Sequence, residues 1–217
     1  MKEDSNIKLK VCGMRYSMNV KEVAESGPDI LGFIFYPPSP RYLPPEIAGE
    51  ITGKVPAGIE KAGVFVNEDL DEVIRLSNEL KLDYVQLHGA ETPEMCAVIG
   101  EQGFNVIKVF GIDERFDFNV LNPYKEHVNY FLFDTKSPKH GGTGLSFEWK
   151  ILDKYDGELP FFLSGGIDLE HLGRIEELTT RNLFALDVNS RFELSPGMKD
   201  LYKVRKLVDR LQVFSRQ

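Results

Sequence analysis

Eight short apolar stretches recur along this chain at similar intervals. They begin close to residues 8, 30, 61, 84, 105, 130, 161 and 183, so that successive starts lie 21 to 31 residues apart. Each stretch is rich in β-branched and aromatic residues and ends at glycine or a polar residue, which is typical of a buried strand. Because the interval fits one strand, one helix and two short connections, the chain is predicted to alternate strands and helices eight times.

The segments between these stretches carry helical signals. Apolar residues at steps of three and four predict a helix that buries Leu201, Val204, Val208 and Leu211. Asp69 and Thr92 stand where a side chain can cap a helix N-terminus, and Pro93 suits the first helical position. The segment from Gly111 to Asn129 is interrupted by Pro123, so a weak or irregular helix is expected after the fifth strand.

Eight strand–helix units predict an α/β fold, a (β/α)8 TIM barrel that occupies residues 1–217 as a single domain. A doubly wound open sheet is the structural alternative. The proline-rich stretch YPPSPRYLPPE lies between a strand and a helix, which indicates an ordered loop rather than a linker between domains.

Composition excludes several classes of protein. The 217 residues carry a formal charge of -8, which argues against a general nucleic-acid binder with its basic stripe. The charged N-terminus is unlike a signal peptide and no apolar run is long enough for a membrane span, so a cytoplasmic protein without a membrane partner is expected. The two cysteines are far apart and form neither a disulfide framework nor a zinc site. Monomer and homodimer both remain open.

A thiol and a carboxyl group stand at the ends of two predicted strands. Cys12 ends the first strand and Asp134 ends the sixth, and in a barrel such side chains face one another across the mouth. A thiolate can remove a proton from carbon, and a carboxylic acid can protonate an oxygen. A thiol base at neutral pH needs a lowered pKa, and Lys10, which has the same strand parity as Cys12, is a candidate to supply the positive charge. The alternative for Cys12 is that it is only a small buried hydrophobic residue. We interpret Cys96, which lies in an apolar helical pattern, in that way.

Glycine-rich turns and a polar strand end predict a phosphate site. The turns are HGGTG, with Gly142 and Gly144, and SGG, with Gly165 and Gly166; the eighth strand leads into Asp187, Asn189 and Ser190. Backbone N–H groups in such turns can approach an anion closely, and the loops after strands seven and eight often bind phosphate in this fold. The simpler interpretation is that these glycines only make tight turns.

Two further side chains are candidates for substrate binding. Arg41 follows the stiff PPSP segment, and a fixed guanidinium suits recognition of a carboxylate; its alternative is a solvated surface arginine. His88 ends the fourth strand, where it either hydrogen-bonds a substrate or fastens its loop. The histidine and carboxylate spacings do not resemble a metal site.

Together these motifs resemble the phosphoribosylanthranilate isomerase family of tryptophan biosynthesis. The matching segments occur in family order from Lys10 to Asp200: KVCGMR, GFIFYPPSPRYL, GVFVN, VQLHG, FDT with GGTGLSFEW, LSGGI, and DVNS with PGMKD. The ordered set is specific, although a single glycine pair is not.

The resemblance implies an Amadori rearrangement on a barrel without cofactor or metal. The substrate would be N-(5-phosphoribosyl)anthranilate and the product 1-(2-carboxyphenylamino)-1-deoxyribulose 5-phosphate. The family's general base falls on Cys12 and its general acid on Asp134, for which a raised pKa is then expected. Arg41 matches the arginine that holds the anthranilate carboxylate, and Asp187 matches an aspartate near the ribose hydroxyls. The phosphate-binding backbone falls on Gly165, Gly166 and the Asn189–Ser190 turn.

One position departs from the family pattern, and two other functions remain as alternatives. Arg191 stands where a glycine is usual, and it either adds a phosphate contact or disturbs the loop. A histidine-pathway sugar-phosphate isomerase is the enzymatic alternative. That family is similar in fold and reaction type, but it has an aspartate at the end of the first strand, where this chain has Cys12. A catalytically silent barrel that binds a phosphorylated ligand is the alternative from another class.

Overall fold

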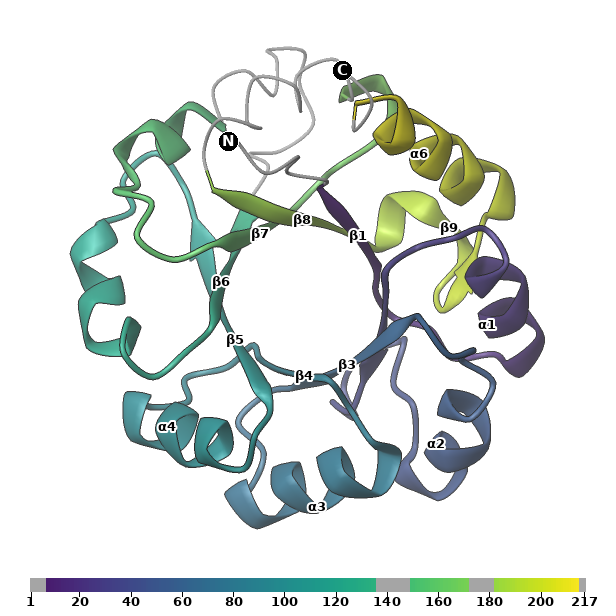
Figure 1. The fold of residues 1–217 in the computed structure, drawn as a ribbon, viewed down its shortest axis with the longest axis horizontal. Coiled ribbons are helices and arrows are strands. Elements are labelled where there is room, and N and C mark those ends of the chain that lie inside the picture. Colours follow the sequence, from purple (N-terminus) through teal and green to yellow (C-terminus); the bar gives the residue numbers. More distant parts are fainter. Residues whose placement is uncertain (1–6, 136–148, 172–181, 215–217) are drawn as a thin grey trace.

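The chain folds into a closed barrel of eight parallel strands. The structure, a computed structural model, describes residues 7–135, 149–171 and 182–214. Each strand pairs with the next in chain order and β8 pairs with β1, which closes the ring (Figure 1). The strands are β1 (Lys8–Val11), β2 (Ile30–Ile34), β3 (Glu60–Phe65), β4 (Tyr84–Leu87), β5 (Asn105–Ile112), β6 (Tyr130–Thr135), β7 (Phe161–Ser164) and β8 (Leu183–Val188). The predicted barrel and its eight strands are therefore confirmed, and the open sheet is excluded.

Helices surround the barrel on its outside (Figure 1). The α-helices are α1 (Ser17–Ala24), α2 (Pro45–Thr52), α3 (Leu70–Leu80), α4 (Pro93–Glu101) and α6 (Leu201–Phe214). The 3-10 helices are η1 (Phe118–Tyr124), η2 (Trp149–Lys154), η3 (Leu169–His171) and η5 (Ser190–Phe192). The element after β5 is a 3-10 helix that contains Pro123, as the irregular sequence predicted, because proline supplies no N–H for a regular α-helix. Among the described residues, no helix is long and apolar enough to span a bilayer.

The predicted caps form at two helix starts. Asp69 accepts a hydrogen bond from the Asp71 N–H at 2.9 Å, and Thr92 accepts one from the Met95 N–H at 3.3 Å. Each bond satisfies an N–H group that has no partner within the helix. The buried face of α3 then packs Val73, Leu76 and Leu80 against the barrel, as its apolar spacing requires.

Alternation along the strands separates two hydrophobic clusters. One cluster lies between the strands and the helices. The other fills the barrel interior and consists of Ile30, Ala62, Tyr84, Ile107, Val109, Leu132, Phe162 and Ala185. Inward positions nearer the carboxyl ends of the strands are polar, including Lys10, Gln86 and Asp187. Because side chains alternate along a strand with a period of two, each strand contributes apolar inward residues to the barrel core and, further along, polar inward residues to the mouth.

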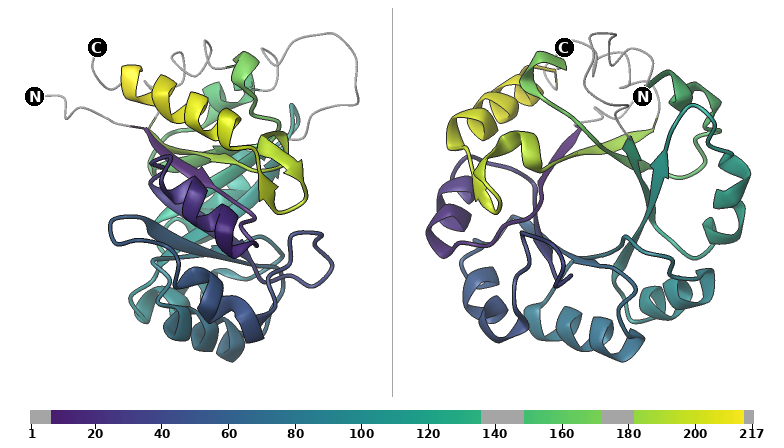
Figure 2. Two further views of the ribbon diagram at one scale, coloured as in Figure 1. Left: turned by 90° about the vertical axis from the view of Figure 1, so that its right-hand side faces the viewer. Right: turned by 180° about the vertical axis from the view of Figure 1, so that it is seen from behind.

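A two-stranded hairpin follows β8 and was not predicted from the sequence. It pairs β9 (Glu193–Ser195) with β10 (Met198–Lys199) in antiparallel fashion. Figure 2 shows it in yellow-green beside α1. The Asn19 side chain fastens it to α1: its Oδ1 accepts the Lys199 N–H at 2.7 Å and its Nδ2 donates to the Lys199 carbonyl at 3.1 Å.

Candidate active site

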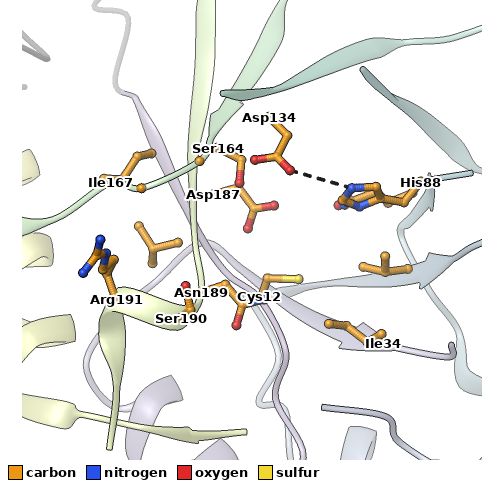
Figure 3. Close-up of a pocket in the computed structure, with 15 residues that line it drawn as sticks. Cys12, Ile34, His88, Asp134, Ser164, Ile167, Asp187, Asn189, Ser190 and Arg191 are labelled. Atoms are coloured by element: carbon orange, nitrogen blue, oxygen red, sulfur yellow. Dashed lines mark hydrogen bonds and ion pairs between the residues drawn. The ribbon is translucent and has the colours of Figure 1, made fainter. Parts of the chain in front are cut away.

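A polar cavity opens at the carboxyl ends of the strands. Its volume is about 330 Å³. The lining residues come from strands all around the ring and include Cys12, His88, Asp134, Ser164, Gly165, Gly166, Asp187, Asn189, Ser190 and Arg191. Figure 3 shows Cys12, Asp134 and Asp187 in the middle, with His88 on one side and Arg191 on the other. The barrel thus brings together predicted site residues that lie far apart in sequence.

Cys12 follows the last residue of β1 and faces this cavity. Its N–H donates to the Val188 carbonyl at 2.9 Å, which holds the thiol beside β8. Gly13 then turns the chain away with φ of +76°, a conformation that suits glycine. Gly32, on the neighbouring β2, leaves room for the sulfur, since a Cβ there would lie 2.9 Å from Cys12 Sγ.

Lys10 lies beneath Cys12 and crosses the barrel interior. Its ammonium donates to Asp187 Oδ2 and to Gln86 Oε1, both at 2.8 Å, and its side chain is fully buried. Lys10 and Asp187 are direct neighbours in the pairing of β1 with β8, which explains their contact. Burial alone would lower the pKa of Lys10, but Asp187 and Cys12 raise it above its ordinary value, so the lysine stays charged.

The pKa of Cys12 is raised above its ordinary value, whereas a thiol base requires a lowered one. Burial is the main cause, because it disfavours the thiolate. Lys10 and Lys199 oppose burial and stabilise the thiolate, whereas Asp187 adds to its cost. The predicted effect of Lys10 therefore has the expected sign but is smaller than the effect of burial, and the resting side chain is the thiol.

Asp134 and His88 face one another across the mouth. His88 Nε2 lies 3.9 Å from Asp134 Oδ2 (Figure 3). Burial in the mouth lowers the pKa of His88, so the ring is neutral near pH 7. Gln86 Nε2 lies 3.5 Å from His88 Nδ1 and can donate to it, which favours a proton on Nε2, the nitrogen that faces the carboxylate.

A second group of site residues forms a turn-rich end of the cavity. Gly165 and Gly166 both have positive φ, at +93° and +64°, and follow β7 directly. Asn189 and Ser190 form the turn after β8. Consecutive backbone N–H groups in such turns make a concave site for an anion. Gly142 and Gly144 lie outside the described residues.

Among the predicted site residues that the structure describes, Arg41 is the one that does not line this cavity. Its guanidinium forms a two-pronged ion pair with Glu193, with Nε–Oε1 at 2.9 Å and Nη2–Oε2 at 2.6 Å. It still lies next to the mouth, because a Cβ on Gly13 would touch both Arg41 Cδ, at 2.7 Å, and Asn189 Oδ1, at 2.8 Å.

Three polar residues of this region were not among the predicted site residues. Gln86 shares strand parity with His88, so alternation alone could have placed it in the interior. Glu193 and Lys199 have no such local signal, because they meet Arg41 and Asn189 only in the folded chain. Metal-ligand geometry is absent from the described ranges, where no three His, Cys, Asp or Glu side chains cluster.

Asp187 has one oxygen with no hydrogen-bond partner among the described residues. Its side chain is 5% exposed, its Oδ2 binds Lys10, and its Oδ1 accepts no hydrogen bond from the described residues. A buried acceptor without a donor is costly, and this carboxylate lines the cavity. A hydroxyl group of a bound molecule would satisfy it.

A closed parallel barrel with polar strand ends gathered around one mouth places this chain in the class of TIM-barrel enzymes. The family described as N-(5'-phosphoribosyl)anthranilate (PRA) isomerase matches residues 9–210. The chain belongs to this isomerase family.

Individual relatives agree with this assignment. An N-(5'-phosphoribosyl)anthranilate isomerase from Parabacteroides distasonis is 40% identical over 206 residues, which cover 94% of this chain and 92% of the relative. The crystal structure of phosphoribosyl anthranilate isomerase from Thermotoga maritima has a TM-score of 0.83 and 33% identity, with 95% of this chain and 99% of that chain covered. Another structure of such an isomerase, solved with reduced 1-(o-carboxyphenylamino)-1-deoxyribulose 5-phosphate, has a TM-score of 0.82, 31% identity and the same coverage.

Proposed function

We propose that this chain converts N-(5-phosphoribosyl)anthranilate to 1-(2-carboxyphenylamino)-1-deoxyribulose 5-phosphate in tryptophan biosynthesis, with Cys12 as general base and Asp134 as general acid. The observation that carries the proposal is that Cys12 and Asp134 line one cavity from β1 and β6, next to a glycine turn suited to phosphate. Family membership supports the substrate, and the geometry supports the two roles.

The first step is opening of the ribose ring. Asp134 gives its proton to the ring oxygen, the C1′–O bond breaks, and the anilino nitrogen supplies the electron pair that forms an iminium ion. In the second step the Cys12 thiolate removes the proton on C2′, and the electrons of that C–H bond form the C1′=C2′ bond of an enolamine. Protonation at C1′ and loss of the hydroxyl proton at C2′ then give the ketone.

The reaction needs one particular protonation state of each of these two groups. The reactive form has a Cys12 thiolate and a protonated Asp134, whereas burial of Cys12 favours its thiol. Lys10, whose charge stabilises the thiolate, favours the reactive form.

Each end of the substrate has a matching feature at the mouth. We assign the phosphate to the Gly165–Gly166 turn and to Asn189 and Ser190, with Arg191 beside it as an added cation. Asp187 Oδ1 would accept a hydrogen bond from a ribose hydroxyl, and His88 would bind near the reacting carbons. Arg41 would hold the anthranilate carboxylate with the guanidinium edge that does not face Glu193.

The test is to follow the fluorescence of freshly made N-(5-phosphoribosyl)anthranilate with wild type, Cys12→Ala and Asp134→Asn. Loss of a general acid or base should lower kcat by at least about a hundredfold in each variant, with smaller changes in KM. Cys96→Ala and Asp113→Asn are matched controls, because Cys96 is buried in α4 and Asp113 is exposed beyond β5. Turnover that survives Cys12→Ala would reassign the base, and no turnover by folded wild type would refute the activity.

A further inference from the structure

Glu193 binds two cations at the edge of the mouth. Its side chain is 4% exposed, and its carboxylate accepts hydrogen bonds from Arg41, from Lys199 Nζ at 2.6 Å and from the Gly197 N–H at 3.0 Å. Burial would raise the pKa of Glu193, but the bonds from Arg41 and Lys199 outweigh it and lower the pKa. The carboxylate is therefore charged at neutral pH and lies between two positive side chains.

The ion pair with Arg41 fixes the orientation of the guanidinium. Arg41 donates to Glu193 through Nε and Nη2, which lie on one edge of the planar group. A two-pronged bond of this kind sets the plane as well as the distance. Within the described residues Arg41 Nη1 has no bonded partner, so the edge that carries it is the one a substrate carboxylate can use.

Lys199 extends the same contacts to the turn after β8. Its fully buried ammonium donates to Glu193 Oε1 and, at 2.8 Å, to Asn189 Oδ1. Asn189 in turn packs where a Cβ on Gly13 would lie, next to Arg41 Cδ. Arg41 and the Asn189–Ser190 turn come from distant parts of the chain, and Glu193 with Lys199 joins them into one unit.

We propose that Glu193 is a positioning residue that sets the spacing between Arg41 and the Asn189–Ser190 turn, and so between the sites for the two anionic ends of the substrate. The proposal rests on the proposed function, which gives the substrate a carboxylate and a phosphate. The unit of Glu193, Arg41 and Lys199 carries a net positive charge of one on a chain whose formal charge is -8. Removal of the Glu193 charge leaves two neighbouring cations that repel one another, so both sites should lose their geometry together.

The experiment compares wild type with Glu193→Gln and Glu193→Asp in the turnover assay. Loss of the charge should raise KM about tenfold and change kcat by no more than about threefold, because Glu193 bonds directly to Arg41 and reaches Cys12 only through the charge of Lys199. Glu193→Asp keeps the charge and should have a smaller effect, and it also serves if Glu193→Gln does not fold. Glu60→Gln is the control, since it breaks the Lys8–Glu60 ion pair at the start of β3 and should leave both constants unchanged.

A double variant separates positioning from general support of the fold. If Glu193 acts through Arg41, Glu193→Gln should raise KM less in an Arg41→Ala background than in wild type. Independent, multiplicative effects would overturn the proposal, and so would a fall in kcat as large as the rise in KM.

Failure of the proposed function would not prevent this test. If wild type does not turn over the substrate, binding of inorganic phosphate and of anthranilate is measured by calorimetry. Weaker binding of both anions to Glu193→Gln than to wild type and Glu60→Gln would uphold the positioning role. Equal binding of both would overturn it.

Discussion

Cys12 lies among groups that act on its thiolate in opposite directions. Burial and Asp187 disfavour its thiolate, whereas Lys10 and Lys199 favour it. Lys10 is itself held by Asp187 and Gln86, so its charge cannot move away from the sulfur without breaking two buried hydrogen bonds. The reactivity of one side chain therefore depends on charges that belong to β1, β8 and β10.

Substitutions at Lys10 and Asp187 should move the Cys12 pKa in opposite directions. Lys10→Met removes a charge that stabilises the thiolate and should raise the pKa further, whereas Asp187→Asn removes a charge that destabilises it and should lower the pKa. Thiolate absorbance against pH, in a Cys96→Ala background, measures both shifts. Lys8→Met, on the same strand but paired with Glu60, is the control and should leave the titration unchanged.

The same thiol affects stability at high pH, with a sign that follows from the shift. A group whose pKa is raised on folding favours the folded state below its unfolded pKa, and this contribution is lost as pH rises through the folded value. Cys12 should therefore make wild type lose stability above the ordinary thiol pKa, and Cys12→Ala should lose less over the same range. The electrostatic account would be contradicted if Lys10→Met and Asp187→Asn shifted the Cys12 pKa in the same direction.

At the scale of elements, two glycines show how position decides the role of one residue type. Gly32 lies in β2 against Cys12, and a Cβ there would press on both Sγ and the Cys12 backbone. Gly49 lies in α2, where a Cβ would meet nothing within 4 Å. The first glycine makes space for the site, whereas the second only adds flexibility to a helix.

Gly32→Ala and Gly49→Ala should therefore have opposite effects. Gly49→Ala should stabilise the protein by about 0.5–1 kcal/mol and leave kcat unchanged, because alanine is the better helix former. Gly32→Ala should displace the thiol and lower kcat, and overpacking should cost about 1–3 kcal/mol of stability. Chemical unfolding and the fluorescence assay measure the two quantities. Unchanged kcat in a folded Gly32→Ala would show that the sulfur does not need this space.

Most elements could be predicted because their signals are local. Each barrel strand is an apolar run that ends at a polar residue, and Asp69 and Thr92 cap their helices through bonds to residues two or three positions away. The β9–β10 hairpin could not be found in this way, since its strands are short and their exposed Leu194 breaks any simple inward pattern. Its stability comes from Asn19 and from the Glu193 contacts, which are distant in sequence.

At the scale of the whole molecule, closure of the barrel makes the site. Parallel strands that pair in a ring place Cys12, His88, Asp134 and Asp187 at one end, and this much followed from the order of the apolar runs. What each side chain contacts there did not follow, since Arg41 and Glu193 are 152 residues apart and meet only through the fold. The effect of burial on the Cys12 pKa also could not be predicted, because the sequence does not show how deeply a residue at a strand end is buried.

The most direct measurement of the central claim is a crystal structure of this protein with reduced 1-(o-carboxyphenylamino)-1-deoxyribulose 5-phosphate. The analogue should place its phosphate against the Gly165–Gly166 and Asn189–Ser190 turns and its carboxylate at Arg41. C2′ should then lie within about 3.5 Å of Cys12 Sγ, the separation of reacting atoms in a productive complex. An analogue bound in the reverse direction, or with C2′ out of reach of Cys12, would contradict the assigned roles.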